Sequence, residues 1–268
     1  MQATSTTTWR VAACSVRGAS HARSDQECQD AHAVVALPNG TLVAAVADGA
    51  GSAALSAVGS ALAVEAAVAA IRAATLPAAT DEDGWQALLT DVARRAQKRL
   101  EAEAETRDVD LNTLATTLLL AVATPETTAV LQIGDGAIVV GDADGGIRAL
   151  TFPLHGEYAN TTVFLTGPDA LKTAQFGLHP AVTHLALFSD GLQRIALDMA
   201  TGAPFAPFFT PLFRFVANEP ETTAAEAQLT AFLRSPRVQE RSEDDITLVL
   251  AARLPASGEE PHPGPAPS

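Results

Sequence analysis

Aspartates at the ends of apolar segments are the best candidates in this sequence for chemistry. Some of them end an apolar run and directly precede a glycine, whereas others open such a run; the set comprises Asp30, Asp48, Asp135, Asp190 and the pair Asp244 and Asp245. A single Asp-Gly pair is typical of a turn. If several such carboxylates meet at the rim of one domain, however, cations must neutralise their repulsion. Oxygen ligands of this kind favour hard ions such as Mg²⁺ or Mn²⁺ over Zn²⁺.

A pair of such ions would define a particular kind of reaction. Two divalent cations can activate a water molecule and hold the oxygens of a phosphate group. The carboxylates therefore predict two-metal hydrolysis of a phosphate ester. No serine or cysteine lies in a motif that activates a nucleophile, which favours direct attack by water over a covalent intermediate.

The charge balance disfavours a nucleic-acid partner. The chain has 268 residues, with 17 Lys and Arg against 31 Asp and Glu, and a formal net charge of −14. Proteins that bind nucleic acid need clustered Lys and Arg for the phosphate backbone. A two-metal nuclease is therefore disfavoured. Hydrophobic residues make up 47% of the chain, which predicts a folded core.

The rest of the composition suggests a cytoplasmic protein without a membrane segment. The two cysteines, Cys14 and Cys28, are too few for a disulfide framework and lack the spacing of zinc ligands. The N-terminus has no signal-peptide pattern. The most apolar stretch, residues 53–74, is mostly alanine and contains Glu65 and Arg72, so we expect a packed helix there.

The order of predicted elements indicates one domain that carries the aspartates at its strand ends. Strands are predicted at residues 11–16, 31–37, 41–47, 114–122, 127–133, 137–140, 147–150, 161–166, 184–188 and 246–252, and helices at 53–74, 85–105, 191–199, 205–216 and 222–233. Asn39-Gly40 and the stretch 142–146 predict hairpin turns. Strands and helices in separate runs favour an α+β fold with antiparallel sheets. We expect a single domain over residues 1–254 and a disordered tail over 255–268.

A set of short motifs makes the chain similar to a known family. In order, they are Ser15-Val-Arg-Gly-Ala-Ser-His21, Cys28-Gln-Asp30, Val46-Ala-Asp-Gly-Ala-Gly-Ser52, Ala115-Thr-Thr-Leu118, Ile133-Gly-Asp-Gly136, Ser189-Asp-Gly-Leu192 and Asp244-Asp-Ile-Thr-Leu248. Over residues 11–252 the chain resembles the metal-dependent Ser/Thr protein phosphatases of type 2C (the PPM family), most of all their compact bacterial members. The resemblance implies a four-layer α-β-β-α sandwich of two antiparallel sheets flanked by helices.

The resemblance also implies a metal site with two Mg²⁺ or Mn²⁺ ions. Asp48 matches the acid that bridges both ions, and Gly49 matches the residue that offers a backbone carbonyl to one of them. Asp190 and Asp244 match the remaining ligands of the other ion. The neighbouring Asp245 matches a position that usually holds asparagine.

Further acids and one cation complete the implied site. Asp30 matches an acid that acts on the metals directly or through water, and Asp135 matches one that holds a looser third ion together with the Asp190 counterpart. Arg23 is the best match for the arginine that grips the substrate phosphate, with Arg17 and His21 as alternatives. Residues 151–175, which include His155 and Glu157, occupy the place of a variable flap.

The expected activity is hydrolysis of phosphoserine or phosphothreonine in proteins. Such an enzyme would act on phosphorylated protein substrates opposite a Ser/Thr kinase, as a monomer in the cytoplasm. The alternative is a pseudophosphatase that binds a phosphoprotein without turnover. Gly136-Ala137, where the family often has Ser-Arg, leaves room for that alternative.

Overall fold

Two antiparallel sheets form the centre of the molecule. The computed structural model describes residues 8–142, 144–153 and 162–254. The first sheet has the order β1 (Trp9–Val16), β10 (Ile246–Arg253), β9 (His184–Phe188), β6 (Ala137–Gly141) and β7 (Ile147–Ala149). The second has the order β2 (Ala31–Ala36), β3 (Leu42–Ala47), β4 (Leu118–Ala123), β5 (Thr127–Ile133) and β8 (Gln175–Pro180). Neighbouring strands are antiparallel throughout.

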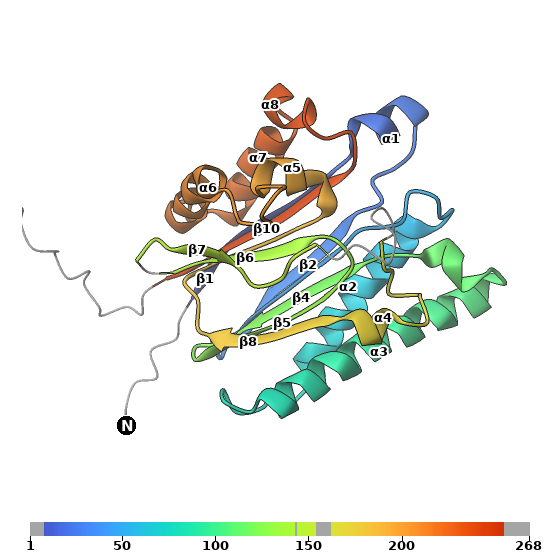
Figure 1. The fold of residues 1–268 in the computed structure, drawn as a ribbon, viewed down its shortest axis with the longest axis horizontal. Coiled ribbons are helices and arrows are strands. Elements are labelled where there is room, and N and C mark those ends of the chain that lie inside the picture. The colour runs from blue at the N-terminus through green and yellow to red at the C-terminus, as the bar shows by residue number, and fades with distance from the viewer. Residues whose placement is uncertain (1–7, 143, 154–161, 255–268) are drawn as a thin grey trace, which may run out of the picture.

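Long helices cover the outer face of each sheet (Figure 1). On the second sheet lie α2 (Ser56–Ala73) and α3 (Glu82–Arg107), and on the first lie α6 (Ala206–Asn218) and α7 (Thr222–Leu233). The shorter helices are α1 (Ala19–Ser24), α4 (Ala170–Thr173), α5 (Gln193–Ala196) and α8 (Pro236–Gln239), with 3₁₀ turns η1 (Leu111–Leu114) and η2 (Asp190–Leu192). The expected four-layer α-β-β-α sandwich is confirmed.

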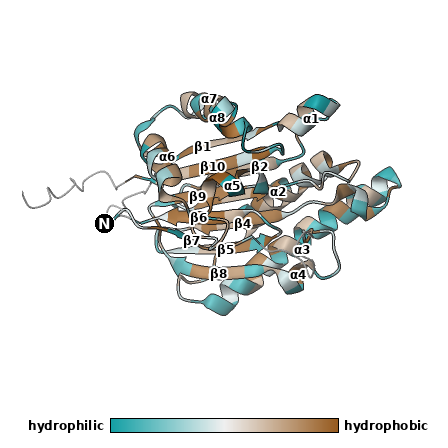
Figure 2. Ribbon diagram, turned by 45° about the horizontal axis from the view of Figure 1, so that its top comes forward, coloured by the Kyte–Doolittle hydropathy of each residue, from teal (hydrophilic) through white to brown (hydrophobic). Residues whose placement is uncertain are grey.

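Three apolar layers hold the sandwich together, one between the sheets and one under each pair of helices. The central strands are apolar on both faces, as the brown ribbons of Figure 2 show, because each is covered by a sheet on one side and a helix on the other. Every residue of β3 and β4 is buried. A fully buried large aliphatic side chain contributes about 1.5–3 kcal/mol, so these strands are rigid supports for the loops at their ends.

The two helices on the second sheet follow from their sequence patterns. In α3, the buried residues Leu89, Val92, Ala96 and Leu100 recur at helical spacing. Asp81 begins the helix by accepting a hydrogen bond from the Gly84 amide at 2.9 Å. By length and composition, α2 could cross a membrane. In the fold it packs against α3, β2 and β3 instead, as expected of a core helix.

Several local predictions were wrong. The strand predicted at residues 161–166 is absent over 162–166, where the chain forms a loop and turn around the buried Leu165. The helix predicted at 191–199 ends at Ala196. Strand β8 was missed because Gly177 and Pro180 are poor strand formers; its backbone pairing with β5 forms it nonetheless.

Parts of the expected chain organisation lie outside the described residues. These are the tail at 255–268, the flap residues His155 and Glu157, Ala143 in the 142–146 turn, and the first seven residues. The turn itself joins β6 to β7, and the Asp142 amide donates to the Gly146 carbonyl at 2.8 Å. The predicted hairpin is therefore confirmed.

Candidate active site

The antiparallel topology brings the sequence-predicted aspartates to one end of the sandwich. Asp48 follows β3 and Asp135 follows β5, two strands that run in the same direction. Asp30 precedes β2, which is antiparallel to β3, so it lies at the same edge. Asp190 follows β9 and Asp244 precedes β10, its antiparallel neighbour. The two edges meet where the Ser189 hydroxyl donates to Asp30 at 2.6 Å.

The backbone around Asp48 is fixed by the two threonines that directly precede β4. The Asp48 amide donates to Thr117 Oγ1 at 2.9 Å. The Asp48 carbonyl accepts from Thr116 Oγ1 at 3.0 Å and from the Thr117 amide at 2.8 Å. These bonds engage the backbone of Asp48 and not its carboxylate.

Gly49 is held so tightly that only glycine fits. A Cβ there would lie 2.7 Å from the Gln29 carbonyl oxygen and 2.8 Å from Ser56. The Gly49 amide donates to Gln29 at 3.2 Å, and the next amide, of Ala50, donates to Ala115 at 2.9 Å. Among the residues that the structure describes, no donor reaches the Gly49 carbonyl oxygen. That oxygen remains available to a cation.

Asp30 is a buried carboxylate with one unused oxygen. Oδ2 accepts from Ser189, whose hydroxyl oxygen accepts from the Thr247 amide at 2.9 Å. Oδ1 is buried and has no partner among the described groups. Burial raises the pKa of Asp30 to about 7; the Ser189 bond opposes this rise, and the charges of Asp245 and Asp190 add to it.

Asp48 and Asp190 share the same electrostatic stress. Each is half-buried. Burial, together with the charges of Asp135 and Asp244, raises the pKa of Asp190 to about 6, and the contact with Asp48 opposes this rise. Burial, followed by the charges of Asp30 and Asp190, raises the pKa of Asp48 well above its usual value. Asp190 Oδ1 is also buried without a hydrogen bond among the described residues. Carboxylates in this state favour a bound proton or a bound cation.

Asp244 and Asp135 both act on Asp190 through their charge. Asp244 is exposed, and its Oδ1 accepts from the Asp245 amide at 2.8 Å. Asp135 is buried; its Oδ2 accepts from Thr162 at 2.7 Å, and Gln193 donates to its carbonyl. Both carboxylates contribute to the raised pKa of Asp190.

A cleft of about 830 Å³ opens beside these acids. It is lined by Asp190, Asp244 and a surrounding ring of residues, namely Ser20, Gly191, Gln193, Arg194, Met199, Glu240, Arg241, Ser242 and Glu243. The cleft is large enough for a phosphorylated side chain and part of its backbone.

The three candidate phosphate-binding residues are all engaged within the protein. Arg23 pairs with Glu243 of the cleft rim at 3.2 Å, with both side chains exposed. The Arg17 guanidinium donates to the Gln26 carbonyl at 3.1 Å. His21 is buried, and its Nδ1 lies 2.9 Å from Asp245.

The donors fit hard divalent cations, although they do not enclose an ion by themselves. Within the described ranges, no three His, Cys, Asp or Glu side chains are already gathered in a way that would hold a metal. The available atoms are oxygens, including the unpartnered Oδ1 atoms of Asp30 and Asp190. Mg²⁺ and Mn²⁺ suit such a set, because they accept oxygen ligands and Mg²⁺ in particular keeps several of its waters.

Sequence reasoning missed several residues that hold the site. Ser189 and Thr247 position Asp30, and Gln193 positions Asp135. Ser189 and Thr247 occur within the quoted motifs, but their hydroxyl groups gave no signal of their partners. Gln193 follows its motif directly and could have been found only from the fold.

Comparisons with known proteins identify the class. A family model described as protein phosphatase 2C matches residues 17–234. "Serine/threonine-protein phosphatase 3" of Escherichia coli (strain K12) is 38% identical over 251 residues, which cover 91% of this chain and 98% of that protein. Fold and sequence together define a phosphatase. The chain belongs to the protein phosphatase 2C family, so the resemblance and the expected enzyme class are confirmed.

Solved structures share the fold at low sequence identity. The serine/threonine phosphatase Stp1 from Staphylococcus aureus has a TM-score of 0.63 and 16% identity, covering 91% of this chain and 95% of that one. The catalytic domain of the serine/threonine protein phosphatase PstP in complex with two manganese ions has a TM-score of 0.61 and 20% identity, covering 93% and 100%. These likenesses support the architecture of the sandwich.

Proposed function

We propose that this protein is a Mg²⁺- or Mn²⁺-dependent phosphatase of phosphoserine and phosphothreonine in proteins. The observation that carries the proposal is the convergence of Asp30, Asp48 and Asp190, whose pKa values are raised and of which Asp30 and Asp190 keep buried Oδ1 atoms that a cation would satisfy. The serine/threonine-protein phosphatase relative supports the substrate class. The manganese complex of PstP supports the choice of metal.

The chain's own residues would hold two ions at the rim. Asp48 would bridge them, with the Gly49 carbonyl on one, and Asp190 and Asp244 on the other. Bound divalent ions supply activation of water near neutral pH and positive charge opposite the phosphate oxygens. Asp30 would orient water from its buried position, and Asp135 with Asp190 could take a looser third ion.

Direct attack by water agrees with the state of the nearby nucleophiles. Burial, followed by the charges of Asp30 and Asp245, raises the pKa of the Cys28 thiol, so the thiol stays protonated. The Ser189 hydroxyl is committed to Asp30. Neither is prepared to form a covalent phosphoenzyme.

The substrate would lie in the 830 Å³ cleft beside Asp190. The lining of this cleft carries four acids, Asp190, Glu240, Glu243 and Asp244, against Arg194 and Arg241. Two divalent ions would therefore turn a cleft that repels phosphate into one that attracts it. Arg23 remains our candidate for the phosphate contact, because an exposed pair such as Arg23–Glu243 is worth only about 0–1 kcal/mol and opens readily.

The domain organisation and cellular setting that we propose are those expected from the sequence. The phosphatase would be a single domain over residues 1–254, act as a cytoplasmic monomer, and reverse the action of a Ser/Thr kinase on its protein substrates.

Phosphate release from a phosphothreonine peptide tests the proposal. We expect turnover with Mn²⁺ or Mg²⁺, none in EDTA, and a loss of at least about 100-fold in Asp48→Asn, because the lost charge is worth several kcal/mol in the transition state. Mn²⁺ binding without turnover in the parent would indicate the pseudophosphatase. Full activity of Asp48→Asn would reject the metal mechanism.

A further inference from the structure

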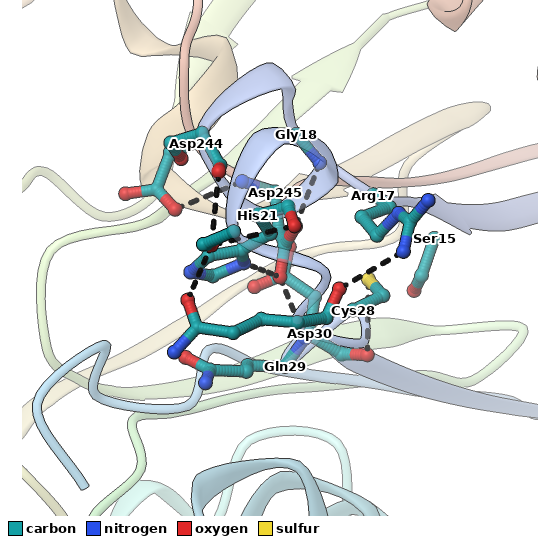
Figure 3. A network of polar contacts seen from close by, with 12 residues as sticks. Ser15, Arg17, Gly18, His21, Cys28, Gln29, Asp30, Asp244 and Asp245 are labelled. Atoms are coloured by element: carbon teal, nitrogen blue, oxygen red, sulfur yellow. Dashed lines mark hydrogen bonds and ion pairs between the residues drawn. The ribbon is translucent and has the colours of Figure 1, made fainter.

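Asp245, next to the expected metal ligand Asp244, has a role that the two-metal site does not explain. Its side chain is almost fully buried, at 2% exposed. Oδ1 accepts from the Gly18 amide at 2.7 Å. Oδ2 accepts from the Gln29 amide at 2.6 Å and lies 2.9 Å from His21 Nδ1. Figure 3 shows this carboxylate between the turn before α1, the His21 ring and the Gln29 backbone.

The contact with Gln29 continues to the other sheet. The Gln29 amide donates to Asp245, and the Gln29 carbonyl accepts from the Gly49 amide at 3.2 Å and from Ser60 Oγ at 2.6 Å. Asp245 is thus linked through the single residue Gln29 to Gly49, and Gln29 also directly precedes Asp30. The segments that carry Asp30, Asp48 and Asp244 therefore meet at one buried carboxylate.

The backbone segments around Asp245 are in close contact, with no room for a side chain at the neighbouring glycines. A Cβ on Gly18 would lie 2.2 Å from the Asp244 carbonyl carbon and 2.7 Å from the Asp245 amide. A Cβ on Gly191, directly after Asp190, would lie 2.1 Å from the Asp245 carbonyl oxygen. Backbone from the Asp190 loop and from the turn before α1 packs directly on Asp245.

We propose that Asp245 is a positioning residue that, together with His21, fixes the relative placement of Asp30, Gly49 and Asp244 for metal binding. The proposal rests on the proposed metal site and adds a requirement to it. The site needs aspartate at position 245, where the family resemblance implies asparagine.

The chemistry of the two backbone donors explains why asparagine is not equivalent in this chain. Aspartate offers two acceptor oxygens, whereas asparagine offers one oxygen and an NH₂ group that only donates. The Gly18 and Gln29 amides contact different oxygens of Asp245. Whichever way an asparagine amide faces, its NH₂ group meets one of these backbone N–H groups, and that contact is lost.

Mn²⁺ titration by calorimetry, read separately from turnover, tests the proposal. We expect Asp245→Asn to weaken Mn²⁺ affinity by about tenfold or more, the effect typical of residues that orient ligands, while kcat at saturating Mn²⁺ changes much less. His21→Ala should weaken affinity by about threefold, and His21→Asn should restore it, because its amide nitrogen can donate in place of Nδ1. The matched control is Asp91→Asn, which changes a partly exposed aspartate of α3 paired with Arg95 and should bind Mn²⁺ as the parent does.

Each outcome separates this proposal from the proposed function. If the parent chain does not bind Mn²⁺, the metal site itself is rejected. If the parent binds and Asp245→Asn binds equally well, only the role of Asp245 is rejected; a variant with a lower melting temperature but unchanged affinity leads to the same conclusion. If Asp245→Asn does not fold, His21→Ala decides, and unchanged Mn²⁺ affinity in that variant overturns the proposal.

Discussion

At the scale of single residues, the candidate site contains buried carboxylates that repel one another, and a bound cation would relieve this repulsion. Asp30 and Asp190 each keep a buried oxygen without a partner among the described residues, at a cost that a folded protein normally avoids. Sequence spacing predicted these acids because a strand end is visible in the sequence. It could not predict the hydroxyl of Ser189 or the triple contact of Asp245, since these depend on how the two sheets meet.

The phosphate contact can be assigned by comparing two arginines. We expect Arg23→Ala to raise KM for a phosphopeptide by about tenfold, the value of a charge-assisted hydrogen bond of about 1.5–3 kcal/mol after the weak Glu243 pair is subtracted. Arg194→Ala, in the lining of the cleft, should have a smaller effect. Steady-state kinetics at saturating Mn²⁺ measures both, and the reverse order would move the phosphate contact to Arg194.

At the scale of elements, helices and strands were predicted well where the local sequence determines the structure, and poorly where contacts with other segments determine it. The strand at residues 127–133 and the helix at 222–233 were predicted at their observed bounds. A short, fully buried run bounded by a turn defines the strand, and buried residues at every fourth position define the helix. Strand β8 exists because β5 offers an edge to pair with. Helix α1 has no side-chain cap at its N-terminus and little apolar pattern, so its local sequence did not predict a helix.

The loop after β3 gives a prediction at this scale. Gly49→Ala places a Cβ 2.7 Å from the Gln29 carbonyl oxygen, so the loop must shift, at a cost of about 1–3 kcal/mol. We expect loss of Mn²⁺ binding and a lower melting temperature. In Gly51→Ala, the nearest atom to the new Cβ is 4.0 Å away, so this variant of the same loop should retain both properties. Equal behaviour of the two variants would contradict the role of Gly49.

At the scale of the whole molecule, the net charge of −14 acquires a local meaning. Much of the acidity is ordinary surface charge; Glu103, for example, pairs with Arg99 and Arg107, which lower its pKa. The rim acids, by which we mean Asp30, Asp48 and Asp190, differ from these surface carboxylates, because burial and mutual repulsion raise their pKa values. The two groups of carboxylates therefore affect stability in opposite directions as the pH changes.

The rim acids predict that the metal-free protein loses stability as the pH rises. The pKa values of Asp190 and Asp30 are about 6 and about 7 in the folded protein, against about 3.9 for an unfolded aspartate. Between these limits the folded state binds more protons than the unfolded state. The stability that Asp30 and Asp190 contribute is therefore fully present below about pH 4 and is lost as the pH rises through 6 and 7.

In EDTA, the melting temperature should fall from pH 5 to pH 8, and Asp190→Asn should reduce that fall. Mn²⁺ should restore the melting temperature at pH 8, because binding at a concentration of 100 Kd adds about 2.7 kcal/mol to the free energy of unfolding, and it should do so far less in Asp190→Asn. Thermal unfolding by circular dichroism across this range measures all of these effects. A melting temperature in EDTA that rises up to pH 8 in the parent would show that the pKa values of these carboxylates are not raised in the folded protein.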